Sequence, residues 1–197
     1  MDFNTVFLAV KELFESGGFV MPPLLLCTML LWYGLGYRFW VLKESHRMSV
    51  RDMLAYYRKT PDAAAHHILD SAIKKGVALK NSGVRDLRWH LDGEFSEYEK
   101  EMRRYSVLVK VIVMISPLLG LLGTVAGMIE TFDSLASMAL FTQSGGIAGG
   151  ISQALFTTQM GLAVAIPGVL VQSTLNRRQY NLAADLEQVK DLLSTQS

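Results

Sequence analysis

The sequence predicts an all-α integral membrane protein with three transmembrane helices, two of which extend into a cytoplasmic helical bundle. Half of its 197 residues are hydrophobic and only 19% are charged. Three stretches contain no Asp, Glu, Lys or Arg: Ser16–Tyr37, Val111–Ile129 and Ser134–Asn176. A helix needs about 20 apolar residues to cross a bilayer, so we assign one span to each stretch. The third has 43 residues, but its "FTQSGG" (141–146) is too polar for the tight turn that two spans would need.

The expected segments follow from these stretches. They are an amphipathic N-terminal helix (1–18), the first span (19–42), a cytoplasmic helical region (43–106), the second span (107–131), a periplasmic loop (132–147), the third span (148–174) and a cytoplasmic C-terminal helix (175–197). The helical spacing of apolar residues in "FNTVFLAVKELF" places the first helix either at the outer membrane boundary or on the protein itself. A cleaved signal peptide is disfavoured, because acids flank Lys11 and the bulky Leu26 precedes Cys27.

Basic residues set the expected orientation. Of the 19 Lys and Arg residues, 13 lie between Lys43 and Arg104, and three follow the third span. The first 15 residues hold one, and residues 131–150 hold none. Because cytoplasmic segments carry the excess of Lys and Arg, we expect the region after the first span and the C-terminus in the cytoplasm. The N-terminus is then periplasmic.

The cytoplasmic region has the pattern of helices. The first is expected to end before Pro61, and Pro61 would start a second that Gly76 closes. From Val84 onward only Gly93 interrupts the pattern, so one continuous helix is expected to run on into the second span. After the third span, apolar residues at spacings of three and four predict a bundle-packing stripe: Leu182, Leu186, Val189 and Leu192 or Leu193.

Small and hydroxyl-bearing residues share one face of the second span and one face of the third. At 100° per residue, the second span places on this face Ser116, Gly120, Gly123, Thr124, Gly127 and Thr131. The third places there Gly150, Ala154, Thr157, Thr158, Gly161, Ala165 and Gly168. Small residues let helices approach closely, so close helix packing is expected at Gly120, Gly123, Gly127 and Gly161. The threonines could instead line a narrow path.

Polar residues inside a membrane are candidates for a functional site. The third span carries Ser152, Gln153, Thr157, Thr158 and Gln159. None of these side chains takes up or releases a proton near neutral pH. The second and third spans contain no acid at depth, because Glu130 and Asp133 come only at the outer end of the second span. If these helices move ions, the central carboxylate must therefore come from another chain.

Other kinds of site find no support in the sequence. Adjacent His66 and His67 point to different sides of a helix, so no metal site is expected. No catalytic triad, pair of catalytic carboxylates or phosphate-binding loop is present, which disfavours an enzyme and a cofactor. No basic cluster is interleaved with aromatic residues, as a nucleic-acid site would need. A non-conducting membrane scaffold, whose glycines only pack helices, stays open as an alternative.

Two motifs resemble the MotA/TolQ/ExbB family of ion-channel subunits, with ExbB and TolQ closer than MotA. They are "SPLLGLLGTVAGMIETF" (116–132) and "GISQALFTTQMGLAVAIP" (150–167). The ExbB and TolQ patterns are "PLLGLFGTVWGIM" and "GIAEALLATAIGLVAAIP". Both motifs stand in the right order and in the right spans, and MotA relatives have four spans rather than three. An ExbB-like subunit of a TonB-type system is the role that this resemblance implies.

The resemblance also implies an assembly and a place in the cell. Such proteins form a ring, thought to be a homopentamer, in the inner membrane of Gram-negative bacteria. The ring surrounds a dimeric ExbD- or TolR-like single-span protein that carries an Asp in each span. Passage of H+ down its gradient then energises a TonB-like or TolA-like protein that acts on the outer membrane. A TolQ-like or flagellar-stator-like role is the alternative within the family.

Individual residues carry over by position. Thr124 and Thr158 match the family's two pore threonines and would face the partner's carboxylate. Gln153 stands where the family has a membrane glutamate. Because Gln cannot bind or release a proton, the protein is expected either to use another ion, such as Na+, or to do without that group. We expect Gln153 and Thr157 on the ion-pathway, partner-facing side.

Charged residues at the two ends of the second span leave alternatives open. Glu130, near the outer mouth, either attracts cations or is an ordinary interfacial acid. Arg103, Arg104 and Lys110 lie at the inner end. They either bind the head groups of anionic phospholipids or supply the usual positive charge of a cytoplasmic surface.

Overall fold

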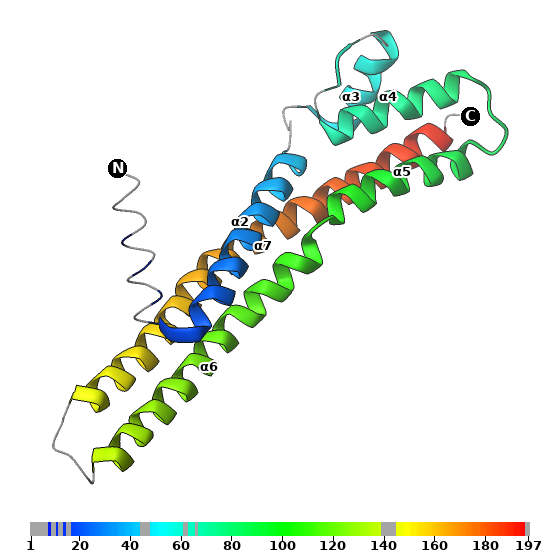
Figure 1. Cartoon of the computed structure of the whole chain (residues 1–197). Coiled ribbons are helices and arrows are strands. Elements are labelled where there is room, and N and C mark those ends of the chain that lie inside the picture. The colour runs from blue at the N-terminus through cyan, green and yellow to red at the C-terminus, as the bar shows by residue number, and fades with distance from the viewer. Residues whose placement is uncertain are drawn as a thin grey trace. The chain divides into compact units, whose positions relative to one another are not determined.

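The computed structural model describes residues 8, 11, 14, 17–43, 48–60, 63–65, 67–138 and 145–195 (Figure 1). Its regular structure within these residues is entirely helical, without a β-strand, which confirms the predicted all-α class. The elements are η1 (Gly18–Val20), α2 (Met21–Val41), α3 (Val50–Lys59), α4 (Ile68–Asn81), α5 (Leu87–Arg103), α6 (Ser106–Met138) and α7 (Gly145–Thr195). The N-terminal helix predicted for 1–18 lies largely outside the described residues.

The chain forms two compact units. The first comprises residues 1–34 and 108–171, and we call it the apolar unit. The second comprises residues 35–107 and 172–197, and we call it the charged unit. Helices α2 and α7 contribute residues to both units.

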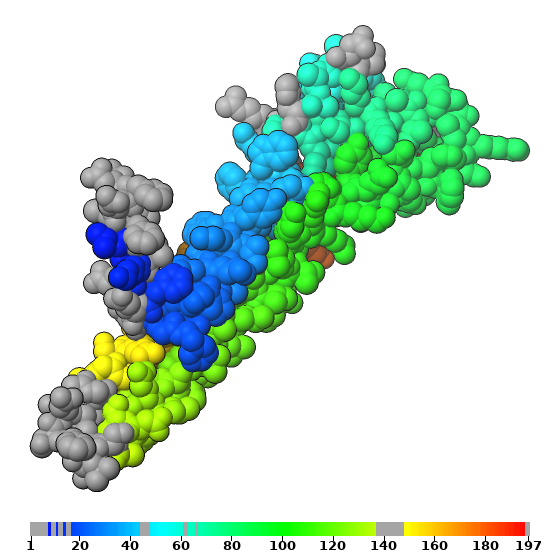
Figure 2. Space-filling model, viewed as in Figure 1, coloured from blue at the N-terminus to red at the C-terminus, as the bar shows by residue number. Residues whose placement is uncertain are grey.

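Three segments are long and apolar enough to cross a membrane, which confirms the predicted number of spans. They are Gly18–Val41, Leu87–Ala136 and Ala148–Thr195. Large apolar side chains are exposed along α6, whose green to yellow-green surface can be followed in Figure 2. Among them are Leu118, Leu121, Val125 and Phe132. A water-soluble protein would bury such a row, whereas lipid or a neighbouring subunit would cover it.

The long helices continue beyond the predicted spans. α6 ends at Met138 and α7 begins at Gly145, so both extend into the segment expected to be a loop, 132–147. Pro117 and Pro167 lie inside α6 and α7 without ending either helix.

The three helices of the apolar unit alternate in direction. α7 runs antiparallel to α6, because successive residues of α7 lie beside residues progressively earlier in α6: Gly150 beside Thr131, Thr157 beside Gly123, and Gly168 beside Val113. α2 runs parallel to α7, since Gly18 lies beside Gln153 and Leu31 beside Gly168. This alternation is the arrangement that three successive membrane crossings require.

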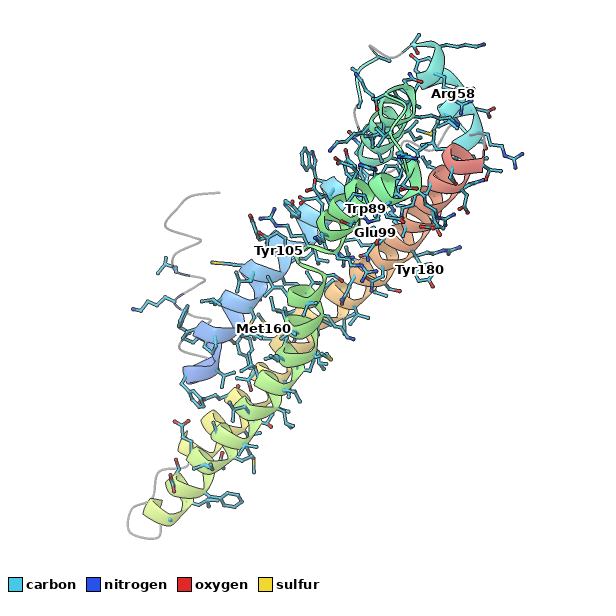
Figure 3. All side chains as sticks on the ribbon, turned by 90° about the vertical axis from the view of Figure 1, so that its right-hand side faces the viewer. Arg58, Trp89, Glu99, Tyr105, Met160 and Tyr180 are labelled. Atoms are coloured by element: carbon cyan, nitrogen blue, oxygen red, sulfur yellow. The ribbon has the colours of Figure 1, made fainter. Side chains whose placement is uncertain are left out.

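The charged unit has a core of its own. Ile73 of α4 and Leu91 and Phe95 of α5 have no exposed surface. The apolar stripe predicted after the third span is buried as expected, at Leu182, Leu186, Val189 and Leu193. A buried lysine, Lys190, joins α7 to α5 through Asp92 (3.2 Å) and Glu99 (3.6 Å; labelled in Figure 3).

Helix α4 differs from its expected bounds at both ends. It begins at Ile68 rather than at Pro61, and the Asp70 carboxylate accepts the backbone N–H of His67 at 3.3 Å at its start. It runs through Gly76 to Asn81, so the predicted stop at Gly76 is wrong. A Cβ at Gly76 would lie 2.7 Å from Leu193 Cδ1. The glycine therefore serves close helix packing and not helix termination.

The continuous helix predicted from Val84 into the second span is wrong. α5 ends at Arg103 and α6 begins at Ser106. Between them Tyr105, labelled in Figure 3, has a φ of 59°, in the left-handed region that non-glycine residues rarely adopt. Its ring packs edge-on against Tyr37 at 5.0 Å between centroids, and the Arg104 guanidinium lies 5.4 Å from both centroids. These tertiary contacts override a local helix preference that no breaker residue opposes.

Candidate functional site

Helices α6 and α7 are joined by contacts of small residues. An added Cβ at Gly161 would lie 2.7 Å from the Ser116 carbonyl oxygen, and one at Gly120 would lie 3.1 Å from the Cα of Thr158. Farther along the same contact, a Cβ at Gly127 would lie 2.6 Å from the Gly150 carbonyl oxygen. Backbone atoms cannot move aside as side chains do, so any larger residue at these positions would push the helices apart.

Thr157 lies inside this contact. It has no exposed surface, and it packs so closely against Gly123 that a methyl group would not fit between them. Its Oγ1 donates to the Ala154 carbonyl at 3.0 Å within its own helix. Thr157 therefore contacts α6 of its own chain and does not present its hydroxyl to another molecule.

The side chains of Thr124 and Thr158 lie beside the contact instead of inside it, and both residues are half-buried. Thr124 follows Gly123 by one residue, as Thr158 follows Thr157. One residue turns the side chain by 100°, and α6 and α7 run antiparallel. The same step on each helix therefore brings Thr124 and Thr158 to the same flank of the contact. We call this side the threonine flank.

The hydroxyl groups of both threonines donate within their own helices. Thr124 Oγ1 donates to the Leu121 carbonyl at 2.6 Å, and Thr158 Oγ1 lies 2.9 Å from the Leu155 carbonyl and 3.1 Å from that of Ala154. This back-bonding satisfies the single donor of each hydroxyl. Each oxygen keeps lone pairs that can accept from a protonated carboxyl or coordinate a cation.

Gln153 lies one turn before Thr157, and its side chain reaches Gly18 in the same chain. Gly18 opens η1 with a φ of 59°. A Cβ there would lie 3.4 Å from the Gln153 side-chain carbon Cδ and closer still to Nε2. The sequence offered no signal for this contact, because 134 residues separate the two positions.

Glu130 is exposed near the end of α6. It follows Thr124 by six residues, which places it about 120° around the helix from that threonine. The structure therefore does not bring Glu130 onto the threonine flank. No other acid lies within 111–130 or 148–176, so these stretches of α6 and α7 supply no carboxylate beside the two threonines.

The three basic residues predicted at the inner surface are exposed. The Arg104 guanidinium is engaged by the Tyr37 and Tyr105 rings, and its Nη1 lies 3.7 Å from a Glu101 carboxylate oxygen. Arg103 borders a cavity of about 290 Å³ between α5 and α7. Lys110 lies near the start of α6, in the apolar unit.

A buried arginine is a feature that the sequence interpretation missed. Arg38 of α2 is only 1% exposed. Its Nη2 donates to Asn176 Oδ1 at 3.1 Å and to Gln179 Oε1 at 2.7 Å, both from α7. Nε and Nη1 have no acceptor among the described residues. Asn176 and Gln179 stand three residues apart on one helix face, which is the only sign in the sequence that they share a partner.

No group of three or more His, Cys, Asp or Glu side chains that would hold a metal ion occurs in the described part of the chain. The threonine flank thus offers neutral hydroxyl oxygens beside a tight helix contact. Such an arrangement can guide an ion or a protonated group past the helices. It cannot by itself supply or store the proton.

Comparison of the sequence with known proteins identifies relatives of this chain. Residues 63–188 match the model of the MotA/TolQ/ExbB proton channel family. A putative biopolymer transport protein ExbB-like 3 from Synechocystis sp. is 30% identical over 181 residues, which cover 85% of this chain and 86% of that protein.

Two further relatives carry established system names. The biopolymer transport protein exbB1 of Vibrio cholerae is 35% identical over 124 residues, covering 63% of this chain and 48% of that protein. The Tol-Pal system protein TolQ of Pseudomonas aeruginosa is 27% identical over 139 residues, covering 64% of this chain and 60% of that protein. Both motifs that carry the resemblance lie inside the family match.

Proposed function

The chain belongs to the MotA/TolQ/ExbB proton channel family, and on that premise we propose that it is an ExbB-like, ion-conducting energiser subunit of a bacterial inner membrane. It conducts H+ together with an ExbD- or TolR-like single-span partner and energises a TonB-like protein that drives outer-membrane transport. Its N-terminus is periplasmic and its C-terminus is cytoplasmic, as the distribution of basic residues indicates.

The observation that carries this proposal is the threonine flank. Thr124 and Thr158 present hydroxyl oxygens on one side of a helix contact whose apolar stretches contain no acid. Ion transfer through such a site requires a carboxylate from a second molecule. An Asp in the partner's span supplies it: the carboxylate takes up H+ on the high-potential side, and the protonated carboxyl donates a hydrogen bond to the flank hydroxyl oxygens as it passes.

The energy available is sufficient for mechanical work. One elementary charge that crosses the membrane is worth about 2.3 kcal/mol per 100 mV. A ring of identical subunits, five in our proposal, presents the same flank repeatedly to a central dimeric partner. Because the dimer and the ring differ in symmetry, each ion passage shifts the partner to the next subunit and so converts the gradient into rotation.

We favour H+ over Na+ as the coupling ion, with the partner's carboxylate as the only titrating group in the path.

Anionic phospholipid head groups are the proposed ligands of Arg103 and Lys110, which are exposed and are not held against aromatic rings as Arg104 is.

A matched pair of substitutions tests the proposal. Thr158→Val removes a hydroxyl from the threonine flank, while Thr157→Val makes the same chemical change one residue away, inside the α6–α7 contact. Leaving a partner group without its hydrogen bond costs about 1–3 kcal/mol. We therefore expect Thr158→Val to lower partner-dependent ion flux in membrane vesicles about tenfold, with normal assembly, and Thr157→Val to leave the flux near wild type. Normal flux and transport in the Thr158→Val protein would count against the proposal.

A TolQ-like role is the second candidate, supported by the similarity to the Pseudomonas protein. The two roles differ in the partner that is energised. Co-purification of a TonB-like protein supports the first role, and co-purification of a TolA-like protein supports the second. A non-conducting scaffold would instead tolerate Ser, Ala and Val alike at Thr124 and Thr158.

A further inference from the structure

The short helix η1, which leads directly into α2, has an unusual backbone. Gly18 has a φ of 59°, a conformation that costs other residues about 1–2 kcal/mol. The residues that follow are deeply buried: Val20, Met21 and Leu24 are each 1% exposed. The first turn of α2 is therefore seated firmly in the apolar unit, and Gly18 sets the angle at which the chain enters it.

The Gln153 side chain occupies the space beside this glycine. A Cβ at Gly18 would lie 3.4 Å from Gln153 Cδ and would overlap Nε2. The backbone angle therefore favours glycine here, and any side chain at this position would also displace the end of the Gln153 amide. Gln153 is half-buried, so its own chain covers part of the residue.

The contact connects α2 to the residues that line the threonine flank. Gln153 and Thr157 are four residues apart and share one face of α7. Thr157 packs on Gly123 of α6, and Thr158 follows it. A shift of α7 at Gln153 would therefore be transmitted within one helical turn to the α6–α7 contact that positions both flank threonines.

The chemistry of the site suits a neutral side chain. The Gln153 amide lies against the backbone of Gly18, and no Lys or Arg occurs within 12–37, 111–130 or 148–176. A carboxylate in its place would be partly desolvated without a cation from these helices. An amide of the same size fills the space without that penalty.

We propose that Gln153 is a positioning residue that seats the first turn of α2 on α7 through Gly18, and that it takes no part in binding the transported ion. The second half of this statement rests on the proposed function. Ion selection then takes place at the threonine flank and the partner's carboxylate, and a titratable group at position 153 is unnecessary.

A double-mutant cycle on the full-length protein tests the contact. Gly18→Ala adds both backbone strain and overlap with the amide, whereas Gly83→Ala adds strain alone, because Gly83 has a φ of 66° and no atom within 4 Å of its added Cβ. The strain is expected to lower the apparent unfolding temperature by about 2–8 °C for a chain of this size. Gly18→Ala should lower it further than Gly83→Ala does.

Truncation of the amide should remove that excess. In the Gln153→Ala background, Gly18→Ala is expected to lower the apparent unfolding temperature only as much as Gly83→Ala does. Gln153→Ala alone should lower the unfolding temperature, while Gln159→Ala, at an exposed glutamine of the same helix, should not. Equal effects of Gly18→Ala with and without the Gln153 amide would overturn the contact. If Gly18→Ala alone does not accumulate in membranes, recovery of the double variant supports the contact and its absence opposes it.

Ion flux separates positioning from ion binding. In the co-purified complex with its partner, Gln153→Ala should lower flux per assembled complex, with the preference for H+ over Na+ unchanged, and Gln159→Ala should lower neither. Gln153→Glu should leave the pH profile of the flux as in wild type. A new titration step in that profile, or a change of ion preference, would show that position 153 lies in the path and would overturn the proposal. Absence of any wild-type flux would instead remove the proposed function, while the stability cycle still decides the contact.

Discussion

Adjacent residues of the same type have different surroundings in this protein. Thr157 and Thr158 cannot be told apart by composition, and both fall on the small face of α7. The 100° between them puts the first against Gly123 and leaves the second half-exposed. The sequence indicated a shared face but could not divide it into buried and exposed positions, because that division depends on how far α6 and α7 are rotated about their axes. The sequence also offered no sign of the residues that Gln153 and Arg38 contact. Each of these contacts joins residues more than 100 positions apart in the chain.

Arg38 gives a prediction at the scale of one residue. Its guanidinium is buried with two nitrogens that lack acceptors among the described residues. A buried charge with no acidic partner among the described residues costs folding free energy, and an apolar side chain of similar volume removes that cost. We therefore expect Arg38→Met to keep or raise the unfolding temperature. Arg38→Ala should lower it, because it leaves a cavity as well. Measurement of thermal unfolding in detergent compares the two, and a severe loss in Arg38→Met would show that the charge has a partner in the assembled protein.

The sequence predicted which segments are helical better than it predicted where each helix begins and ends. Absence of charge identified the three spans, and the apolar stripe after the third span was correct at every buried position. Local signals failed where tertiary packing decides. Gly76 looked like a helix end but provides room for Leu193. Tyr105 looked like an ordinary helical residue but turns the backbone, because its ring and that of Tyr37 enclose Arg104.

The glycines of α6 and α7 give a prediction at the scale of a helix pair. Gly127 and Gly149 are both helical, but they differ in the space around them. An added Cβ at Gly127 would lie 2.6 Å from a backbone oxygen, whereas an added Cβ at Gly149 would meet no neighbouring atom within 4 Å. We expect Gly127→Ala to destabilise the protein by about 1–3 kcal/mol through overpacking. Gly149→Ala should be neutral or stabilise it by about 0.5–1 kcal/mol, because alanine is the better helix former. Thermal unfolding of the two variants checks this, and equal stability would contradict the α6–α7 contact.

The whole molecule has the features of one part of a larger assembly. Its family is established by the match over residues 63–188 and by a relative that aligns with most of the chain. The two threonines lie on one flank, yet no acid of this chain accompanies them within the apolar stretches of α6 and α7. A protein that conducts ions in this way is incomplete without a partner that brings a carboxylate. Sequence motifs predicted that requirement, whereas the number and identity of the other subunits are properties of the complex and are not encoded in a single helix face.

Native mass spectrometry of the protein, gently extracted from its own membrane, tests this central claim most directly. We predict a complex of five copies of this chain with two copies of a small single-span protein whose span contains an Asp. Detection of that partner would identify the carboxylate that Thr124 and Thr158 face. A lone subunit, or a ring without any Asp-bearing partner, would contradict the account, because the threonine flank would then have no charge to pass.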